Sequence, residues 1–287
     1  MIVSYNGPPS LREHVAALRL QVDALVIVDN GSQSECLAML QQIRADYDCK
    51  IIYNRSNLGV ARALNIGSDF AIQNGFDWIV TFDQDSEVSE TFIASLFQTY
   101  NDNSSPRQVG MLLPTCIEPA LQLDLSQIRC TFVNSKGTIL TGITSGAMTK
   151  AEVFQDCGRF REDLFIDCID TEFCLRINRS GWRILQSRNA LLFHALGHIS
   201  SRTILGRTIR TTNHSAGRRY YRTRNRLLLW RLYFRSFPNW VADDMLAFAR
   251  ETINLLLMET QKAAKIVAIL RGMRDALLGH FGYRIKL

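Results

Sequence analysis

Two aspartates, Asp83 and Asp85, follow a mostly apolar stretch in the sequence WIVTFDQDSEVS (78–89). The apolar residues predict a buried strand, and two carboxylates at its end are costly to leave unpaired. Hard divalent cations prefer oxygen ligands and often bridge carboxylates to substrate phosphates. The pair could therefore hold a metal ion and a phosphate. It could also carry a covalent phosphoryl group, or Asp85 or Ser86 could cap a helix that begins near Ser89.

Asp29 is a second candidate, because it ends another apolar run and opens the turn sequence DNGS. A carboxylate at this position can accept the imide N–H of a uracil or thymine base, although an ordinary Asx-turn explains it equally well. Asn57 and Gly59 in NLG could allow the backbone to approach a ribose or base, since glycine has no Cβ. A helix cap formed by Asn57 is the alternative.

Asp170 is the candidate general base. It stands in DCIDTE, where Asp167 and Glu172 are close in sequence. Clustered carboxylates raise one another's pKa, and a carboxyl group with a raised pKa is a useful general base. The alternative is a set of first-turn acids favoured by the helix dipole. His194 ends a later strand and becomes a metal ligand candidate only if the same cleft holds the metal.

The elements that position these residues alternate between apolar strands and amphipathic helices. Such alternation favours an α/β fold with a mostly parallel sheet, in which ligands bind beyond the carboxyl ends of the strands. SYN, DNGS, NRSNLG and DQDS each follow one of the first four strands. The sequence TSGAMTKAEVF is predicted to be a turn leading into a helix. Strands are expected at 2–4, 24–28, 50–53, 78–82 and 184–193, and helices at 10–20, 35–44, 59–73, 165–176 and, as two or three helices, from about 218 onward.

The composition of the 287-residue chain is that of a globular protein, with 47% hydrophobic residues. Its seven cysteines contain no C-x-x-C pair, so neither a structural zinc site nor a disulfide framework is indicated. Reduced thiols in a cytoplasmic protein are the simplest interpretation. The sequence shows no signal peptide and no run of apolar residues long enough to span a membrane.

Charge is distributed unevenly along the chain. The formal net charge is +6, yet residues 177–240 contain 13 arginines and no acidic residue. Such a block indicates anionic partners, which could be phosphates, lipid head groups or nucleic acid.

The densest part of this block predicts a basic amphipathic helix with interleaved aromatic residues. We expect it to lie on an anionic membrane surface, or to bind a lipid-linked diphosphate through arginine side chains. The alternative is a solvated face on which some arginines pack against acidic residues of the catalytic domain. The residues expected to make these contacts are Arg218, Arg219, Tyr220, Tyr221, Arg222 and Arg226.

Taken together, the motifs resemble glycosyltransferase family 2, with its GT-A fold, over roughly residues 2–200. They occur in the family's order: SYN, VDNGS, NLGVARALNIG, FDQDS, TSGAMTKAEVFQDCGRF, DTEFCLR and LLFHALG. VDNGS, FDQDS, FIDCIDTEFCLR and RRYYRTRNRLLLWR resemble most closely the bacterial branch that uses dTDP-rhamnose. The first strand begins at Met1 and is shorter than is usual in the family. Either the strand is short, or the native start lies upstream, or the sheet tolerates a trimmed edge.

The resemblance implies roles for individual residues. Asp83 and Asp85 would bind Mg²⁺ or Mn²⁺ on the donor diphosphate, with His194 as a less secure ligand. Asp170 would be the catalytic base, although the glutamate that precedes this aspartate in the family is replaced by Ile169. The nucleotide would be bound by Tyr5, Asn6, Asp29, Asn57, Gly59, Arg62 and Asp83. The donor sugar and acceptor would lie near Ser145, Gly146, Asp167 and Glu172.

The implied function is an inverting transfer of L-rhamnose from dTDP-rhamnose to a lipid-linked acceptor in O-antigen or other surface polysaccharide synthesis. A UDP-sugar donor is the nearest alternative. We expect a catalytic domain over residues 1–205 and a basic helical region over 206–287. The enzyme would be cytoplasmic, peripheral on the inner face of the bacterial membrane, without a nucleic-acid partner, and homo-oligomers are possible.

Two other classes of protein compete with this interpretation. FDQDSEV also resembles the nucleophile loop of haloacid-dehalogenase-like phosphohydrolases, in which Asp83 would be phosphorylated and Asp85 would act as acid and base. That loop normally follows the first strand of its fold, whereas here two strand–helix units precede it. A nucleic-acid-binding module built on the arginine and tyrosine block is the second competitor, but it leaves the strand-end carboxylates unexplained.

Overall fold

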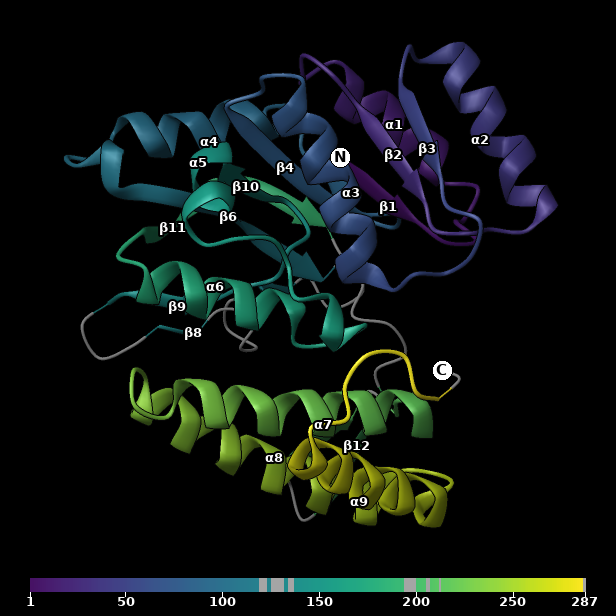
Figure 1. The fold of residues 1–287 in the computed structure, drawn as a ribbon, viewed down its shortest axis with the longest axis vertical. Helices are drawn as coiled ribbons and strands as arrows, with labels where there is room; N and C mark the ends of the chain where they lie inside the picture. The colour runs from purple at the N-terminus through teal and green to yellow at the C-terminus, as the bar shows by residue number, and fades with distance from the viewer. Residues whose placement is uncertain are drawn as a thin grey trace. The chain divides into compact units, whose positions relative to one another are not determined.

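The computed structural model describes residues 1–118, 123–124, 132–133, 137–193, 200–204, 207–211 and 213–285. The chain forms two compact units (Figure 1). Unit 1 comprises Met1–Glu162 and Asp170–Ala195, and unit 2 comprises Asp163–Ile169 and Leu196–Leu287. The loop 163–169 is thus a part of unit 2 that interrupts the sequence of unit 1.

Unit 1 is built on a mixed sheet with the strand order β3-β2-β1-β4-β10-β6-β11-β5, and β7 pairs with β6 beside this path. β1, β2, β3 and β4 run parallel, whereas β10 is antiparallel to both β4 and β6. The strands are β1 (Ile2–Ser4), β2 (Val26–Asp29), β3 (Lys50–Tyr53), β4 (Trp78–Asp83), β5 (Glu87–Val88), β6 (Val109–Glu118), β7 (Leu123–Asp124), β10 (Ala147–Lys150) and β11 (Arg183–Phe193), with β8 (Phe132–Val133) and β9 (Ile139–Thr141) forming a separate pair. The predicted α/β fold is confirmed, and the sheet, which was predicted to be mostly parallel, is parallel from β1 to β4 and mixed beyond them.

The helices of unit 1 follow the predicted apolar periodicity. In the first helix, for example, Leu11, Val15 and Leu18 recur at one helical face and are buried. The helices are α1 (Leu11–Arg19), α2 (Ser34–Asp46), α3 (Val60–Gln73), α4 (Phe92–Asn101), α5 (Ala151–Asp156) and α6 (Ile169–Arg179), with a short 3₁₀ turn at Pro106–Gln108. A second 3₁₀ turn, Glu162–Leu164, begins at the last residue before the loop 163–169 of unit 2.

Two predicted elements differ from the structure. The helix predicted at 165–176 begins only at Ile169, because Phe165, Asp167 and Cys168 adopt left-handed φ angles of 64°, 61° and 62°. Such backbone is incompatible with a right-handed helix and is uncommon outside glycine. The stretch TSGAMTKAEVF is more than a turn and a helix, since it contains strand β10 before α5.

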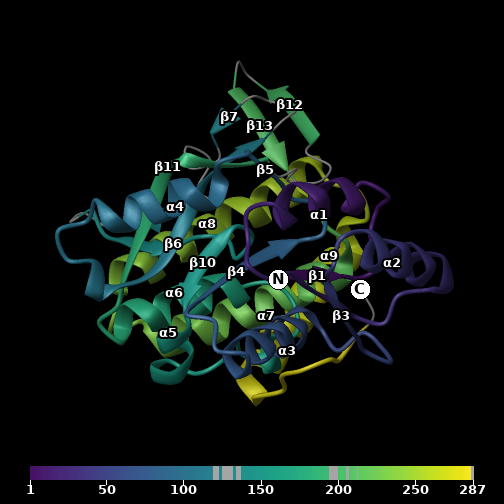
Figure 2. The ribbon, with the colours of Figure 1, turned by 90° about the horizontal axis from the view of Figure 1, so that it is seen from above.

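Unit 2 contains the hairpin β12 (Ser200–Ile204) and β13 (Arg207–Thr211), shown in Figure 2, followed by α7 (Ala216–Tyr233), α8 (Pro238–Met258) and α9 (Lys262–Leu278). The prediction of two or three C-terminal helices is confirmed. The Ser215 side chain caps α7 by accepting a hydrogen bond from the backbone N–H of Arg218. A buried cluster joins the loop 163–169 to the helices through Phe165, Tyr220, Tyr221 and Ala268. Within the described residues, no helix is long and apolar enough to cross a membrane.

Candidate active site

The carboxyl ends of the four parallel strands lie in one row. Strand pairing places Ser4 opposite Asp29, Asp29 opposite Tyr53, and Val3 opposite Asp83. The polar sequences that follow these strands therefore begin at the same edge of the sheet. This is the edge at which ligands bind in open α/β sheets.

Two buried serines, Ser86 and Ser145, anchor the turn that holds Asp83 and Asp85. The backbone N–H of Asp83 donates to Ser145 Oγ at 3.2 Å, and Ser145 Oγ lies 2.6 Å from Ser86 Oγ. Asp85 is exposed. Neither Asp85 nor Ser86 caps the next helix, because α4 begins at Phe92 after an intervening strand, β5. The helix-cap interpretation of this motif is therefore wrong.

Gly146, next to Ser145, shapes the same turn from the side of β10. Its φ is +74°, and its backbone N–H donates to the carbonyl of Thr81 at 2.7 Å. A Cβ here would lie 2.8 Å from Pro114. The position therefore requires glycine for both its backbone angle and its close packing.

Gln84, between the two aspartates, was not identified from the sequence. Its Oε1 accepts hydrogen bonds from the backbone N–H of Tyr5 at 2.8 Å and from Ser4 Oγ at 3.4 Å. Its own carbonyl lies 3.1 Å from His14 Nδ1. Gln84 therefore ties the end of β1 to the turn after β4, and the glutamine between two acids is the only sequence signal for this role.

Asp29 is 1% exposed and uses its two oxygens differently. Oδ2 accepts hydrogen bonds from the backbone N–H groups of Gly31 and Ser32 at 3.3 and 3.2 Å, which is the predicted Asx-turn. Oδ1 is buried and has no hydrogen-bond partner among the described residues. An unsatisfied buried carboxylate oxygen is costly, which makes Oδ1 a candidate acceptor for a ligand donor such as an imide N–H.

Asn30 is a second residue that the sequence analysis missed. It is 1% exposed and joins the loop after β2 to the loop after β3. Its Nδ2 donates to Asn57 Oδ1 at 3.1 Å, and its Oδ1 accepts from the backbone N–H of Leu58 at 3.0 Å. Asn57 Oδ1 also accepts from the N–H of Gly59, which is itself the N-cap residue of α3. The alternative in which Asn57 caps the helix is therefore wrong, and its side chain shapes the loop.

The remaining candidates for the nucleotide site lie at the same edge of the sheet but differ in exposure and in hydrogen bonding. Tyr5 is 45% exposed directly after β1. Asn6, with φ 48°, accepts from the backbone N–H of Gln33 at 2.9 Å through its side-chain oxygen. Arg62 Nη1 donates to Glu162 at 2.9 Å, so its guanidinium is held by a carboxylate of unit 1.

Asp170 stands in the first turn of α6. Its Oδ1 accepts from the backbone N–H of Thr171 at 2.8 Å. Burial and then the nearby charge of Asp170 raise the pKa of Cys174 to about 12, so this thiol stays protonated. Glu172 is 2% exposed and accepts two hydrogen bonds from Arg176, at 2.7 and 3.1 Å. Glu172 therefore has an internal partner.

Asp167 belongs to unit 2, where Arg218 holds its carboxylate through three hydrogen bonds of 3.2 Å. The left-handed loop around it is fixed by two buried side chains of α7. Asn225 Nδ2 donates to the carbonyls of Leu164, Ile166 and Asp167, and Arg224 Nη2 donates to those of Asp163 and Leu164. These hydrogen bonds to backbone carbonyls stabilise a left-handed loop conformation that the residue types of the loop do not favour.

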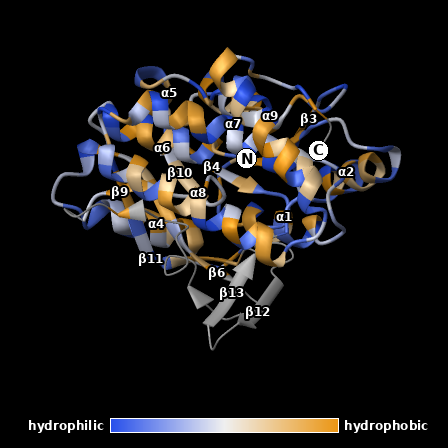
Figure 3. Cartoon of the chain, turned by 90° about the horizontal axis from the view of Figure 1, so that it is seen from below, coloured by the Kyte–Doolittle hydropathy of each residue, from blue (hydrophilic) through white to orange (hydrophobic). Residues whose placement is uncertain are grey.

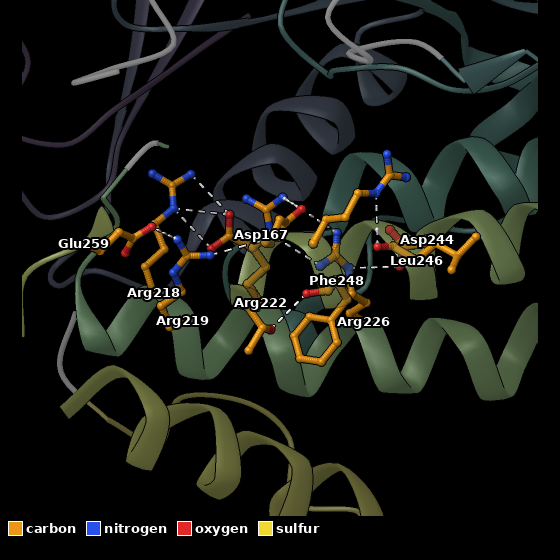
Figure 4. Close-up of polar contacts among 12 residues, drawn as sticks. Asp167, Arg218, Arg219, Arg222, Arg226, Asp244, Leu246, Phe248 and Glu259 are labelled. Carbon is orange, nitrogen blue, oxygen red and sulfur yellow. Dashed lines mark hydrogen bonds and ion pairs between the residues drawn. The ribbon is translucent and has the colours of Figure 1, made fainter. Parts of the chain in front are cut away.

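The predicted lipid-binding face of α7 requires a correction. Tyr220 and Tyr221 are 1% and 0% exposed, and the side chains of Arg219 and Arg226 are each 8% exposed, so none of these four can lie on a membrane surface. Figure 4 shows why the arginines are not available to a membrane: their side chains point toward carboxylates of α8 and of its C-terminal end. The pairs are Arg219 with Glu259 and Glu251, Arg222 with Glu251, and Arg226 with Asp244 and Glu251.

The ion pairs of this network determine the pKa of Glu251. Burial alone would raise the pKa of Glu251, but the charges of Arg222 and Arg226 hold it below its ordinary value. Arg218 and Arg222 retain partly exposed side chains, at 46% and 31%. Four arginines of the block, Arg218, Arg219, Arg222 and Arg226, thus pair with carboxylates of the same chain.

The donor set for a metal ion at the sheet edge consists of oxygen atoms. Within the described residues, no group of three or more His, Cys, Asp and Glu side chains is arranged to hold a metal, and His194 lies outside those residues. Two carboxylates in one turn nevertheless fit Mg²⁺ or Mn²⁺ when substrate phosphates supply further ligands. No disulfide joins the described cysteines.

Comparison with solved structures identifies the fold. The chain aligns over 97% of its length with a mannosyltransferase from Pyrobaculum calidifontis, solved with GDP-Man and Mn²⁺, with a TM-score of 0.62, 14% identity and 85% of that chain covered. It aligns over 96% of its length with S. aureus TarS 1–349, solved with UDP-GlcNAc, with a TM-score of 0.60, 15% identity and 80% of that chain covered. The fold is that of the GT-A glycosyltransferases.

Sequence comparison then gives the family. Residues 1–105 match the model of glycosyl transferase family 2. The chain is 32% identical over 243 residues to the dTDP-rhamnosyl transferase RfbF of Shigella flexneri, covering 80% of this chain and 79% of that protein. It is 26% identical over 221 residues to the galactofuranosyltransferase GlfT1 of Mycolicibacterium smegmatis, covering 71% and 72%. The chain belongs to glycosyl transferase family 2 and is a glycosyltransferase, so the phosphohydrolase interpretation is wrong.

Proposed function

We propose that this protein is an inverting rhamnosyltransferase that uses dTDP-rhamnose. The observation that carries the proposal is the row of strand ends, in which Asp29 keeps one buried, unsatisfied carboxylate oxygen and the exposed Tyr5 follows Ser4, the strand partner of Asp29. A thymine or uracil base offers an imide N–H to such an oxygen and a ring face to tyrosine. The similarity to a dTDP-rhamnosyl transferase favours the thymidine donor over the UDP-sugar alternative.

The diphosphate of the donor would extend from the base toward the turn after β4. Asp83 and Asp85 would hold Mg²⁺ or Mn²⁺ there, which stabilises negative charge on the departing nucleoside diphosphate. The two buried serines below the turn, Ser86 and Ser145, fix its backbone, so the carboxylates do not have to be ordered when the donor binds.

Asp170 would take the proton from the acceptor hydroxyl. That oxygen would then attack the anomeric carbon of the sugar from the face opposite the leaving group. Ser145 and Gly146 would border the donor sugar. Asp167 and Glu172 were predicted to lie near the donor sugar and acceptor, and their arginine partners now favour a role in shaping the loop 163–169 and helix α6.

We further propose that the acceptor is a lipid-linked glycan in O-antigen or other surface polysaccharide synthesis. The enzyme would act in the cytoplasm, peripherally on the inner face of the membrane. The excess of arginine in residues 177–240 supports contact with anionic lipids, and the partly exposed Arg218 and Arg222 stay candidates for it.

A donor screen tests the proposed function. Release of nucleoside diphosphate from dTDP-rhamnose, UDP-galactose and UDP-N-acetylglucosamine is measured with Mn²⁺, with Mg²⁺ and with EDTA. We expect turnover of dTDP-rhamnose with metal and its loss with EDTA. Asp170→Asn should abolish transfer yet bind the donor as tightly as the wild type, and Asp102→Asn, at an exposed site after α4, is the matched control. Preference for a UDP-sugar, or full turnover by Asp170→Asn, contradicts the proposal.

A further inference from the structure

In unit 2, several positively charged side chains line a cleft at the end of α9. Its volume is about 340 Å³, and it is lined by Tyr220, Arg271, Arg274, Asp275, His280, Arg284 and Ile285. This volume is at the lower end of the range of small-molecule sites, about 300–1,000 Å³. Three guanidinium groups and one imidazole thus face a single carboxylate.

The fold brings these residues together through a tight return of the chain. α9 ends at Leu278, and Gly279, with φ +73°, provides the left-handed residue that terminates the helix. The following segment then folds back, and Tyr221 Oη accepts from the backbone N–H groups of Arg284 and Ile285 at 2.9 and 3.0 Å. Arg284 is therefore carried on an anchored segment beside the last turns of α9.

The one carboxylate of the cleft is already satisfied. Asp275 Oδ2 accepts from Tyr220 Oη at 2.7 Å, and Oδ1 accepts from Arg274 Nε and Nη2 at 3.0 and 2.8 Å. His280 Nδ1 lies 3.8 Å from the same Oδ1. Burial alone would raise the pKa of Asp275, but the hydrogen bonds from Tyr220 and Arg274 hold it below its ordinary value. The carboxylate therefore orients Arg274 and does not bond to Arg271 or Arg284.

Arg271 and Arg284 are the cations with the least internal compensation. Both are exposed, and among the described residues neither forms an ion pair. Arg284 Nε makes one long hydrogen bond to the carbonyl of Phe281, at 3.4 Å. Guanidinium groups bind phosphate oxygens in a bidentate manner, and several convergent arginines are a phosphate site.

We propose that this cleft binds a phosphate or diphosphate group. Its lining provides charge and lacks an apolar pocket that could receive a nucleobase. Leu277, Leu278 and Tyr283 near the cleft are 78%, 60% and 63% exposed, and Figure 3 shows the hydrophobic stretches of α9 in orange. The group can therefore belong to a soluble molecule or to a lipid whose tail lies beyond these side chains. The inference does not depend on the proposed rhamnosyl transfer.

Titration calorimetry with inorganic pyrophosphate, at low ionic strength and with EDTA, tests the site. Without a divalent metal, Asp83 and Asp85 repel pyrophosphate, so the donor site does not contribute. The double variant Arg271→Gln/Arg284→Gln removes two charge-assisted contacts and should bind at least about tenfold more weakly. The control variant Arg235→Gln/Arg250→Gln makes the same charge change at exposed positions of unit 2 outside the cleft and should bind like the wild type.

A second arm of the experiment identifies the source of the phosphate. Sedimentation is measured with vesicles of phosphatidylcholine alone and with added phosphatidic acid. Loss of vesicle binding in the cleft variant supports a lipid head group, and loss only of pyrophosphate binding supports a soluble ligand. The proposal is overturned if neither arm distinguishes the cleft variant from the control, since binding would then follow net charge alone. Circular dichroism of both variants verifies that they are folded.

Discussion

Replacing Glu259 by glutamine tests whether internal carboxylates hold the arginines of α7. The Glu259 side chain is fully buried at the end of α8 and accepts hydrogen bonds from Arg219 and from Lys265 Nζ, the latter at 2.8 Å. Arg219 and Lys265 are themselves only 8% and 3% exposed in their side chains. Glutamine preserves the shape of the side chain and removes its charge, which leaves two cations buried side by side.

The expected loss of unfolding free energy depends on the groups that remain around Arg219 and Lys265. Removing one partner of a buried ion pair costs about 3–5 kcal/mol of unfolding free energy. Arg219 keeps Glu251 at 3.8 Å, and Lys265 keeps Asn213 Oδ1 at 2.6 Å, so both cations retain partial compensation. We therefore expect a loss near the lower end, about 3 kcal/mol. Adding Lys265→Met removes one of the two cations and should recover about 1 kcal/mol or more.

Urea unfolding followed by tryptophan fluorescence measures this loss. Trp230 and Trp240 belong to unit 2, so a background with Trp78→Phe and Trp182→Phe reports on that unit. The control Asp243→Asn alters an exposed carboxylate of α8 and should change stability by less than about 0.5 kcal/mol. A loss for Glu259→Gln below about 1 kcal/mol, or no recovery in the double variant, would refute the internal pairing of the arginines.

Three further predictions concern backbone angles, protonation and the strained loop. Gly31→Ala, where φ is +85° and a Cβ would meet backbone at 2.5 Å, should lower the unfolding free energy in urea by more than Gly75→Ala, which has φ +78° and open space around it; equal losses would contradict this. Nuclear magnetic resonance should give His214 a pKa of about 4, because burial and then the charges of two neighbouring arginines disfavour its protonated form. Stability then falls as the pH drops from about 6.5 toward 4, and a measured value of 6 or more would contradict the burial. Asn225→Ala should accelerate amide hydrogen exchange in the loop 163–169, since the carbonyls of Ile166 and Asp167 lose this donor and that of Leu164 keeps only Arg224, and unchanged exchange would show that the loop does not depend on Asn225.

Those parts of the site that depend on local sequence could be predicted. Apolar runs locate β2 and β4 to within two residues, and the polar residue that ends each run, Asp29 or Asp83, falls at the edge of the sheet. Parallel pairing then brings these ends into one row without further information, because the register of each strand follows from its buried face. The candidates Tyr5 and Asp85 follow from the same reasoning.

The parts that depend on contacts distant in sequence could not be predicted. Gln84 bonds to Tyr5 across 79 residues and Asn30 to Leu58 across 28, and an amide in a turn gives no sign of such partners. The strand AMTK, β10, contains only one β-branched residue, and its pairing with β4 and β6 makes it a strand. The loop 163–169 has left-handed residues that are not glycine, so its conformation depends on the donors supplied by Arg224 and Asn225.

The arginine block shows why charge along a sequence indicates partners only after the fold is known. Residues 177–240 contain no acid, yet the next segment contributes five, and four of them, Asp244, Glu251, Glu259 and Asp275, bond to basic or tyrosine side chains of unit 2. Since α8 follows α7 in sequence, a helix that looks uncompensated alone acquires its counter-charges from the next helix and its C-terminal end. The cations best able to bind an external anion are therefore those that pair least with carboxylates of the chain itself. Arg271 and Arg284 meet this condition, which favours the end of α9 for the proposed phosphate site, whereas Arg218 and Arg222 on α7 are partly exposed but already paired with carboxylates.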